Sequence, residues 1–380
     1  MAGIYIHIPF CRQACHYCNF HFATTLKQKD AMVAALVKEI STAPSLLPQD
    51  ENDAETNIST LYFGGGTPSI LSIADLKMIF DAVQKRFLFA PGAEITLEAN
   101  PDDITVEKLS EWQQLGVNRL SVGIQSFAED ELKWMHRAHT AAESLVCIDL
   151  IKAAGYTNFS IDLIYGSPLL TDETWKQNVM TVIEKNIPHI SCYALTVEPK
   201  TALDKLVKLQ KKDNVDPEQQ ARQFLLLMDW MAAAGYEHYE ISNFAKPGQR
   251  SRHNSSYWSG EIYYGFGPSA HSFDGKKRKW NIANNSLYIQ ALQEGSIPAE
   301  EEILTGIQQL NEYIMTSLRT MEGLALKKVN TIWGNDAITK LKRQSIKWEM
   351  SGKLKMENDR LVLTQEGKLF ADGIAADLFF

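Results

Sequence analysis

The 380-residue chain lacks any uninterrupted apolar run of the ~20 residues that a membrane-spanning helix needs, so we expect no transmembrane segment. Its opening, MAGIYIHIPF, has no Lys or Arg ahead of the apolar residues, and that short run ends at Pro9. Secretory leaders start with basic residues before a longer apolar segment, so we expect no leader. Together these absences predict a reducing, cytoplasmic location.

Positive charge is also in short supply. The 38 Lys and Arg residues are outnumbered by 46 Asp and Glu residues, which gives a net charge of −8. This balance argues against a nucleic-acid partner, because nucleic-acid-binding proteins neutralise phosphates with basic side chains. We interpret the basic run 276–279 as a solvated turn, and residues 43–56 as a loop.

Cysteine is scarce and unevenly placed. The five cysteines are an odd number in a long chain, which argues against a framework of disulfides. Cys147 and Cys192 lie on apolar segments, and we interpret them as inert core thiols. The other three lie within eight residues of one another, in the segment HIPFCRQACHYCNF. Such crowding in a reducing compartment indicates metal or redox chemistry.

The first two-thirds of the chain alternate between strand-like and helix-like segments. Strands are predicted at 3–9, 58–66, 94–101, 117–126, 157–168 and 189–199, and helical periodicity lies between them. Six strands joined by helices predict right-handed crossovers and a parallel sheet. We therefore expect an α/β fold built on a partial, TIM-like (β/α)6 barrel, with its site at the carboxyl ends of the strands.

After about residue 200 the pattern changes. A helix is predicted at 217–234, and an irregular stretch rich in aromatics and glycine at 236–275. Helices near 302–321 and 336–350, two short strands and a C-terminal helix predict a small α+β, winged-helix-like module, interpreted as a packing or partner-docking unit. The expected domains are a barrel (1–200), a linking region that completes it (201–295) and this module (296–380).

Cys11, Cys15 and Cys18 follow the pattern C-x3-C-x2-C directly after the first strand. Positions i, i+4 and i+7 can turn three sulfurs toward one point. Three thiolates suit a [4Fe-4S] cluster in which one iron has no protein ligand. Zinc is the competing interpretation, since a structural zinc site takes four ligands and His7, His16 and His21 are all nearby.

The segment YIHIPFCRQACHYCNF resembles the cluster loop of radical S-adenosylmethionine (SAM) proteins, and more narrowly that of the oxygen-independent coproporphyrinogen III oxidase family. The resemblance implies that SAM chelates the open iron through its amino and carboxylate groups. It also implies SAM contacts at positions matching the family's binding segments: Tyr5, Tyr17, Gly65, Gly66, Thr67, Glu98, Gln125, Arg137 and Asp162.

Several of these positions also have ordinary structural interpretations. The glycines of FGGGTP would let the backbone approach a ligand, but they could equally form a turn. Arg137 could be a solvated helix charge and Gln125 a strand cap. Asp162, within FSIDLIYG, is harder to explain this way because a buried acid needs a partner. Their distribution over successive strand ends favours a binding site.

Two departures separate the chain from the oxidases of this family. Phe20 stands where the oxidases have a fourth cysteine, and the first strand begins almost at Met1 instead of after a long N-terminal segment. In both features the chain resembles the haem chaperone (HemW) branch of the family. The chain also resembles that branch in carrying the signature H-N-x-x-Y-W, as His253, Asn254, Tyr257 and Trp258. The resemblance implies that these four residues are haem-binding candidates. His271 is a weaker candidate.

The resemblance implies a haem chaperone with three cofactors or ligands: a [4Fe-4S] cluster, SAM and haem. Expected partners are acceptor haemoproteins, including respiratory enzymes that would bring the chaperone to a membrane surface, and a second copy in a cluster-dependent homodimer. The alternative is an oxygen-independent coproporphyrinogen III oxidase, which decarboxylates two propionates. A third interpretation needs no haem contact: His253 would only hydrogen-bond a loop while Tyr257 and Trp258 fill the core.

Overall fold

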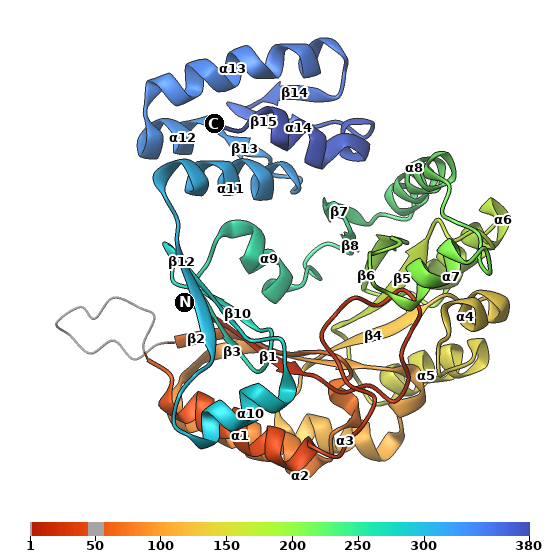
Figure 1. Ribbon diagram of the computed structural model, residues 1–380. Helices are drawn as coiled ribbons and strands as arrows, with labels where there is room; N and C mark the ends of the chain where they lie inside the picture. Colours follow the sequence, from red (N-terminus) through yellow and green to blue (C-terminus); the bar gives the residue numbers. More distant parts are fainter. Residues whose placement is uncertain (1, 45–56) are drawn as a thin grey trace.

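The computed structural model describes residues 2–44 and 57–380, so most of the predicted loop 43–56 lies outside the described residues. Its larger part is built on one twelve-stranded sheet, ordered β12-β11-β10-β9-β1-β2-β3-β4-β5-β6-β8-β7 (Figure 1). Six parallel strands form the centre in sequence order: β1 (Ala2–Ile8), β2 (Asn57–Gly65), β3 (Leu88–Ala99), β4 (Arg119–Gln125), β5 (Phe159–Tyr165) and β6 (His189–Ala194). The predicted partial (β/α)6 barrel is confirmed.

Helices connect these strands and cover the outside of the barrel. They are α1 (Lys29–Thr42), α2 (Ile73–Arg86), α3 (Val106–Leu115), α4 (Glu129–Met135), α5 (Ala141–Ala153), α6 (Asp172–Glu184), α7 (Ala202–Lys208) and α8 (Pro217–Ala233). Local sequence fixes several of their starts. Ser72 and Thr140 each form a capping box with Asp75 and Glu143, three residues on, which fixes where α2 and α5 begin.

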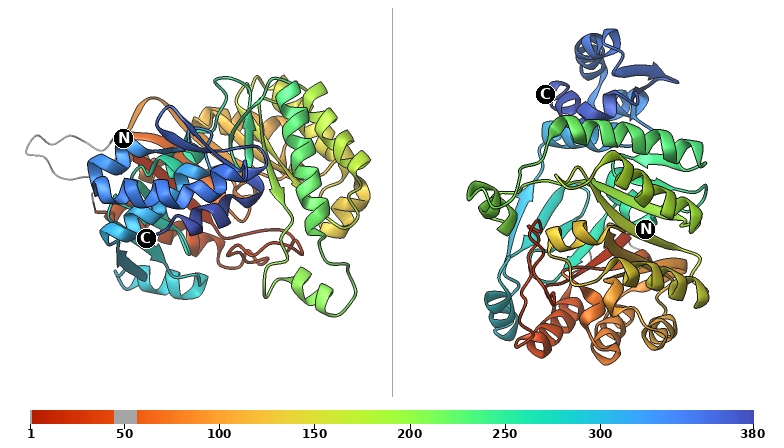
Figure 2. Two further views of the ribbon diagram at one scale, coloured as in Figure 1. Left: turned by 90° about the horizontal axis from the view of Figure 1, so that it is seen from above. Right: turned by 90° about the vertical axis from the view of Figure 1, so that its right-hand side faces the viewer.

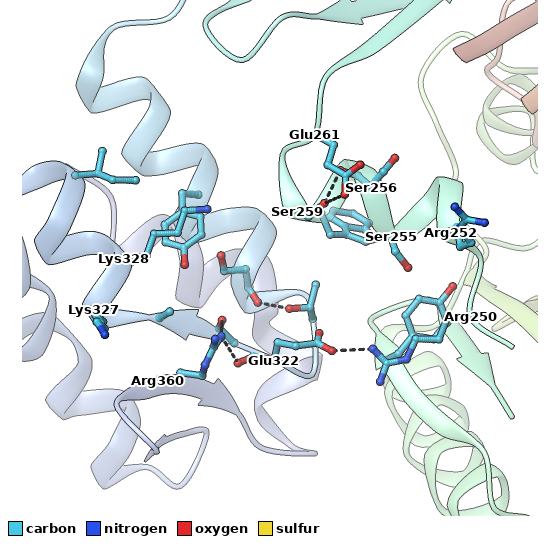
Figure 3. A pocket seen from close by; sticks show the side chains of 18 of the residues that line it. Arg250, Arg252, Ser255, Ser256, Ser259, Glu261, Glu322, Lys327, Lys328 and Arg360 are labelled. Atoms are coloured by element: carbon cyan, nitrogen blue, oxygen red, sulfur yellow. Dashed lines mark hydrogen bonds and ion pairs between the residues drawn. The ribbon is translucent and has the colours of Figure 1, made fainter. Parts of the chain in front are cut away.

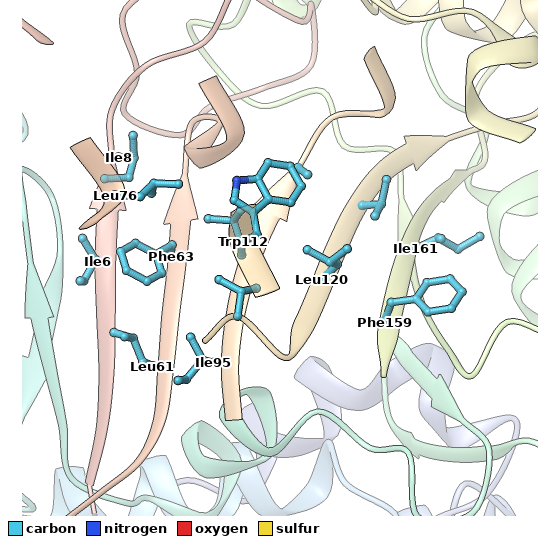
Figure 4. Close-up of a cluster of buried hydrophobic side chains, with 14 of the residues drawn as sticks. Ile6, Ile8, Leu61, Phe63, Leu76, Ile95, Trp112, Leu120, Phe159 and Ile161 are labelled. Carbon is cyan, nitrogen blue, oxygen red and sulfur yellow. The ribbon is translucent and has the colours of Figure 1, made fainter. Parts of the chain in front are cut away.

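Each barrel strand sends apolar side chains toward the helices and polar ones into the barrel interior. Ile6 and Ile8 of β1 and Phe63 of β2 are buried against the helix side, with Leu76 of α2 and Trp112 of α3 (Figure 4). The opposite face of β1 carries Tyr5 and His7, whose rings lie among other polar side chains. This alternation follows from the two-residue repeat of a strand, and it leaves a polar interior for a site.

Additional strands extend both edges of the central sheet. On one side lie β9 (Tyr263–Phe266), which pairs with β1 in parallel, then β10 (His271–Phe273), β11 (Lys277–Asn281) and β12 (Ala299–Ile303), with α10 (Asn285–Gln293) before the last. On the other side, β8 (Asn243–Ala245) and β7 (Glu237–Glu240) follow β6.

The prediction of an irregular stretch at 236–275 is wrong. The segment contains β7, β8, β9 and β10, together with α9 (Arg252–Ser259). These elements are only three to eight residues long, too short to show a hydrophobic period in the sequence. They form because the open edges of β1 and β6 supply hydrogen-bond partners.

The basic run 276–279 is not simply a solvated turn, so that interpretation is wrong for most of it. From Lys277 onward it belongs to β11, which pairs with the acidic strand β12. Lys277 is ion-paired with Glu301 at 3.1 Å. Arg278 is ion-paired at 2.8 Å with Glu312, which lies on α11 (Gly306–Leu318), the helix after β12. The run is therefore balanced by acidic residues that are distant in sequence.

The C-terminal module, residues 306–380, has a separate hydrophobic core and lies over one end of the barrel (Figures 1 and 2). It comprises α11 (Gly306–Leu318), β13 (Leu324–Ala325), α12 (Leu326–Trp333), α13 (Asn335–Met350), β14 (Leu354–Glu357), β15 (Arg360–Leu363) and α14 (Ala371–Asp377). Its three-stranded antiparallel sheet has the order β13-β15-β14. The predicted helices and hairpin are present, whereas β13 and α12 were missed.

In residues 2–44 and 57–380, no helix combines the length and apolar character needed to cross a membrane.

Candidate functional site

A cavity of about 410 Å³ opens at the carboxyl ends of the barrel strands. It gathers side chains from the loop after β1 and from the ends of β2 to β6, as expected for a site in a parallel barrel. Of the twelve predicted cluster and SAM residues, eleven line it: Cys11, Cys15, Tyr17, Cys18, Gly65, Gly66, Thr67, Glu98, Gln125, Arg137 and Asp162.

The cysteine loop is held in place by backbone hydrogen bonds. The amide of Cys11 donates to Ala23 O at 3.0 Å, which closes the loop on itself. Cys11 Sγ accepts a hydrogen bond from Thr67 Oγ1 at 3.6 Å. Burial raises the pKa of Cys11 to about 11 and also raises the pKa of Cys18. Both thiols are therefore protonated at neutral pH until a metal displaces the proton.

All five cysteines are free thiols. Cys147 and Cys192 are buried in the apolar core, in agreement with their interpretation as core thiols. Across the described residues, no three His, Cys, Asp or Glu side chains converge as ligands of a single metal ion. The three clustered cysteines instead share the wall of a wider cavity.

The glycines of FGGGTP serve the cysteine loop directly. A Cβ on Gly66 would lie 2.5 Å from the carbonyl oxygen of Phe10, the residue before Cys11. The amides of Gly66 and Thr67 donate to Ile8 O and Phe10 O at 2.8 and 2.7 Å. The close approach that requires glycine is thus made by the protein's own backbone, which docks the cysteine loop on the end of β2.

Two carboxyl groups lie in the barrel interior beneath the cysteine loop. Glu98 accepts hydrogen bonds from Tyr62 Oη at 2.8 Å and from the amide of Gly65 at 3.2 Å, and burial raises its pKa to about 8. Burial likewise raises the pKa of Asp162 to about 6, while a hydrogen bond from Ser191 opposes that shift. Both acids would accept hydrogen bonds from a bound ammonium or hydroxyl group.

Arg137 is the central cation of the cavity, so its interpretation as a solvated helix charge is wrong. It lies just beyond α4, and its Nη2 donates to Gly123 O and Asn100 Oδ1 at 2.7 and 2.9 Å. Its Nη1 lies 3.3 Å from Cys15 Sγ. Although burial opposes its charge, Tyr17 and Cys15 raise the pKa of Arg137 above its ordinary value.

Gln125 takes a backbone conformation that L-residues seldom adopt. Its φ is +68° at the carboxyl end of β4, and the side chain is buried in the cavity wall. Residues kept in this region cost about 1–3 kcal/mol and are concentrated at functional sites. This strain favours a binding role over that of an ordinary strand cap.

The remaining predicted residues near the cavity pack around it. Tyr5 does not line the cavity in the described structure; its hydroxyl lies 3.1 Å from His7 Nδ1 and its ring stacks on Tyr62. The three histidines considered as a fourth ligand bond elsewhere: His7 to His21 O, His16 to Trp134 O, and His21 to Asn285. Among the described residues they do not line the cavity.

Asn100, Gly123 and Tyr193 also line the cavity, and sequence reasoning missed them. Asn100 follows Glu98 by two residues in LEANP, so the strand-end argument that selected Glu98 would have selected it too. Tyr193 lies near the end of β6 and could have been found in the same way. The contribution of Gly123 is a carbonyl oxygen, which carries no signal in the sequence.

The H-N-x-x-Y-W residues lie on α9, near the opposite end of the barrel. His253 is 1% exposed, and its ring nitrogens lie 2.8 Å from Thr60 Oγ1 and 3.0 Å from Tyr257 Oη. Its ring stacks on Tyr62 of β2. Within the described residues, Trp258 alone of the four lines a second cavity, between α9 and the C-terminal module. His271 is exposed on β10 and stacks on Trp280.

The first cavity fits the cofactors that the sequence implies. Three thiols share its wall, and within the described residues Arg137 Nε is buried with no hydrogen-bond partner. A carboxylate on a bound ligand would satisfy that nitrogen. Phe20, at the position of the fourth oxidase cysteine, also lines the cavity and is 69% exposed. The donor set thus suits an iron–sulfur cluster with an open position for an amino acid ligand.

Comparison with known proteins first defines the class. Residues 5–181 match the family described as the radical SAM superfamily, and this range includes part of β1, the cysteine loop and β2 to β5. The solved structure of coproporphyrinogen III oxidase (HemN) from Escherichia coli, described as a radical SAM enzyme, has the same fold. Its TM-score is 0.85 at 23% identity, covering 100% of this chain and 90% of that one.

Relatives then define the family within that class. The chain is 33% identical over 381 residues to the heme chaperone HemW of Mycobacterium tuberculosis, covering 99% of this chain and 94% of the relative. It is 32% identical over 379 residues to HemW of Bacillus subtilis, covering 98% of both. The chain belongs to the HemW family of radical SAM proteins.

Proposed function

We propose that the protein is a haem chaperone, which binds haem and delivers it to acceptor haemoproteins. The observation that carries this proposal is the 33% identity to a HemW relative over nearly the whole of both chains. That extent includes the C-terminal module and α9 as well as the radical SAM region, so the likeness is not confined to a shared cofactor domain.

In this proposal Cys11, Cys15 and Cys18 hold a [4Fe-4S] cluster, and SAM occupies the same cavity. Bound together, the two groups supply one-electron chemistry. The protein's own residues prepare the cavity. Arg137 places a positive charge beside the thiols, and Gly66 with Thr67 fixes the cysteine loop. Glu98 and Asp162 provide acceptors for polar hydrogens of the ligand.

The expected partners extend the proposal. Acceptors would include respiratory enzymes, which would bring the protein to a membrane surface without inserting it. The protein would work in the cytoplasm, and a cluster-dependent homodimer would be its assembled form. These points are supported by the resemblance of the cysteine loop and of the H-N-x-x-Y-W signature to the chaperone branch.

One experiment separates the chaperone from an oxidase. The anaerobically reconstituted protein is titrated with haem, and a second sample receives coproporphyrinogen III, SAM and a reductant. We expect one haem bound per chain and no conversion of the porphyrinogen. Robust formation of protoporphyrinogen would overturn the proposal and establish the oxidase instead.

A further inference from the structure

A second and larger cavity, of about 980 Å³, lies between α9 and the C-terminal module. One wall contains Ser59 and Thr60 of β2 and several residues of α9, and the other comes from α11, β13, α12 and β15 (Figure 3). Because β2 starts at Asn57 and ends at Gly65, this cavity and the cysteine cavity lie toward opposite ends of the barrel strands. We call it the interdomain cleft.

The two walls of the cleft are held together by specific contacts. The amide of Ile241 donates to Arg319 O and that of Met321 donates to Tyr239 O, both at 3.0 Å. Arg250 spans the boundary, with ion pairs to Glu237 at 3.0 Å and Glu322 at 2.7 Å. These main-chain hydrogen bonds fix the module beside the barrel, so the two walls of the cleft have a defined position relative to each other.

The cleft concentrates positive charge in an acidic protein. Its lining contains five cationic side chains and two acidic ones, Glu261 and Glu322, although the whole chain has a net charge of −8. Arg250 is balanced by its ion pairs. The other four have no ion pair to a carboxylate among residues 2–44 and 57–380: Arg252, Lys327, Lys328 and Arg360. Such a surface attracts a ligand with more than one negative charge.

The cleft also has the size and surface for a flat aromatic ligand. Ligand cavities typically measure about 300–1,000 Å³, and this one lies near the upper limit. Trp258 and Tyr313 line it from opposite walls, and Tyr239 of β7 also lines it. The rings of Trp258 and Tyr313 are each also close to a cation. The guanidinium carbon of Arg319 lies 5.4 Å from the centre of the Trp258 ring, and Lys328 Nζ lies 4.2 Å from the centre of the Tyr313 ring.

We propose that haem binds in the interdomain cleft, with its macrocycle between α9 and the C-terminal module and its two propionates paired with the unpaired cations. Lys327, Lys328 and Arg360 on the module wall are the principal partners, and Arg252 contributes from α9. This inference rests on the proposed function. It assigns haem contact to Trp258, while His253 positions α9 from behind through Thr60 and Tyr257.

The test compares haemin with its dimethyl ester, in which both propionate charges are masked. The full-length variant K327Q/K328Q should bind haemin about tenfold more weakly than the parent protein, since two charge-assisted contacts are lost. Its affinity for the ester should equal that of the parent. The matched control K342Q/R343Q removes two exposed cations of α13 that lie outside the cleft and should bind both probes normally.

A second variant tests whether haem lies in the interdomain cleft, independently of its charge contacts. Ser259 is exposed at the end of α9 and lines the cleft, so S259W should fill the space without disturbing the core. We expect weaker binding of haemin and ester alike, with an unchanged far-ultraviolet circular dichroism spectrum. Normal binding of both probes by S259W would overturn the inference.

The outcomes distinguish this inference from the proposed function. If the parent protein binds no haem, the proposed function fails. If the parent binds haem but K327Q/K328Q binds haemin equally well, the propionate pairing is wrong and haem lies elsewhere on a chaperone. Equal weakening of haemin and ester by K327Q/K328Q would also exclude the pairing, because charge would not be what the lysines contribute.

Discussion

The position of His253 in the fold determines its protonation state and its contribution to stability. Its ring is buried between β2 and α9 and is hydrogen-bonded on both sides, and burial lowers its pKa to about 3. An unfolded histidine has a pKa near 6.5, so below that pH the unfolded chain binds a proton at His253 and the folded chain does not. His253 therefore contributes stability at neutral pH that is lost as the pH falls from about 6.5 toward 3.

This linkage gives a prediction for H253Q, whose amide retains a donor and an acceptor but does not titrate. Between pH 6 and pH 4 the stability of the parent protein should fall more steeply than that of H253Q, by about 1.4 kcal/mol per pH unit. Urea denaturation at several pH values measures the difference. Parallel pH profiles would show that His253 is not buried as a neutral ring.

The cysteines give a second prediction at this scale. C15A should abolish iron–sulfur absorbance after anaerobic reconstitution, because one of three ligands is missing, and should leave the barrel folded. The core contains Cys147 and not Cys15, so C147A is the matched control: it should keep the absorbance and lose some stability. Full absorbance in C15A would contradict the ligand assignment.

At the scale of elements, the turn after β2 and the loop after β1 form one unit. Two backbone hydrogen bonds join them, and Gly66 lets their backbones touch. Neither segment alone places the cysteines. The loop reaches its position only because parallel pairing of β1 with β2 brings Ile8 opposite Gly65.

G66A should therefore displace the cysteine loop. The new Cβ would lie 2.5 Å from Phe10 O, a backbone atom that cannot easily move, and such overpacking costs about 1–3 kcal/mol. Iron content after reconstitution and the midpoint of thermal unfolding, Tm, should both decrease.

G373A is the matched control, because no described atom lies within 4 Å of its new Cβ on the exposed side of α14. It should raise the stability by up to about 1 kcal/mol, as alanine does in helices. A G66A protein with normal iron content would show that the loop does not depend on this contact.

At the scale of the whole molecule, the two cavities are separated by the barrel interior. The cysteine cavity lies at the carboxyl ends of the strands, whereas the interdomain cleft lies beside the start of β2. Between them stand Glu98, Tyr62 and His253, joined by the Tyr62–Glu98 hydrogen bond and the stacking of Tyr62 on His253. The proposed sites for SAM with its cluster and for haem therefore do not overlap.

This separation predicts independent occupancy. C15A, without a cluster, should bind haem with the affinity of the parent protein, and K327Q/K328Q should reconstitute the full iron content. Haem titration and iron analysis on the same preparations measure both. Loss of haem binding in C15A would place haem in the cysteine cavity instead of the cleft.

The sequence was sufficient for the barrel and for most of the first cavity. Long periodic segments predicted the helices, and six apolar strands in alternation predicted the parallel sheet. Because parallel strands bring their carboxyl ends together, motifs far apart in sequence could be assigned to one place. Eleven of twelve such residues line the cavity. Asn100 was missed although the same argument applies to it.

The tertiary structure alone decided whatever depends on partners distant in the chain. Short strands such as β8 and β9 exist only because the edges of β6 and β1 offer hydrogen bonds, and Lys277 finds Glu301 only through the pairing of β11 with β12. The interdomain cleft is the clearest case. Trp258 belongs to a signature that the sequence already marks, but Lys327 is an ordinary residue in its own segment. A cationic cavity forms only where packing of the C-terminal module against α9 brings the two together.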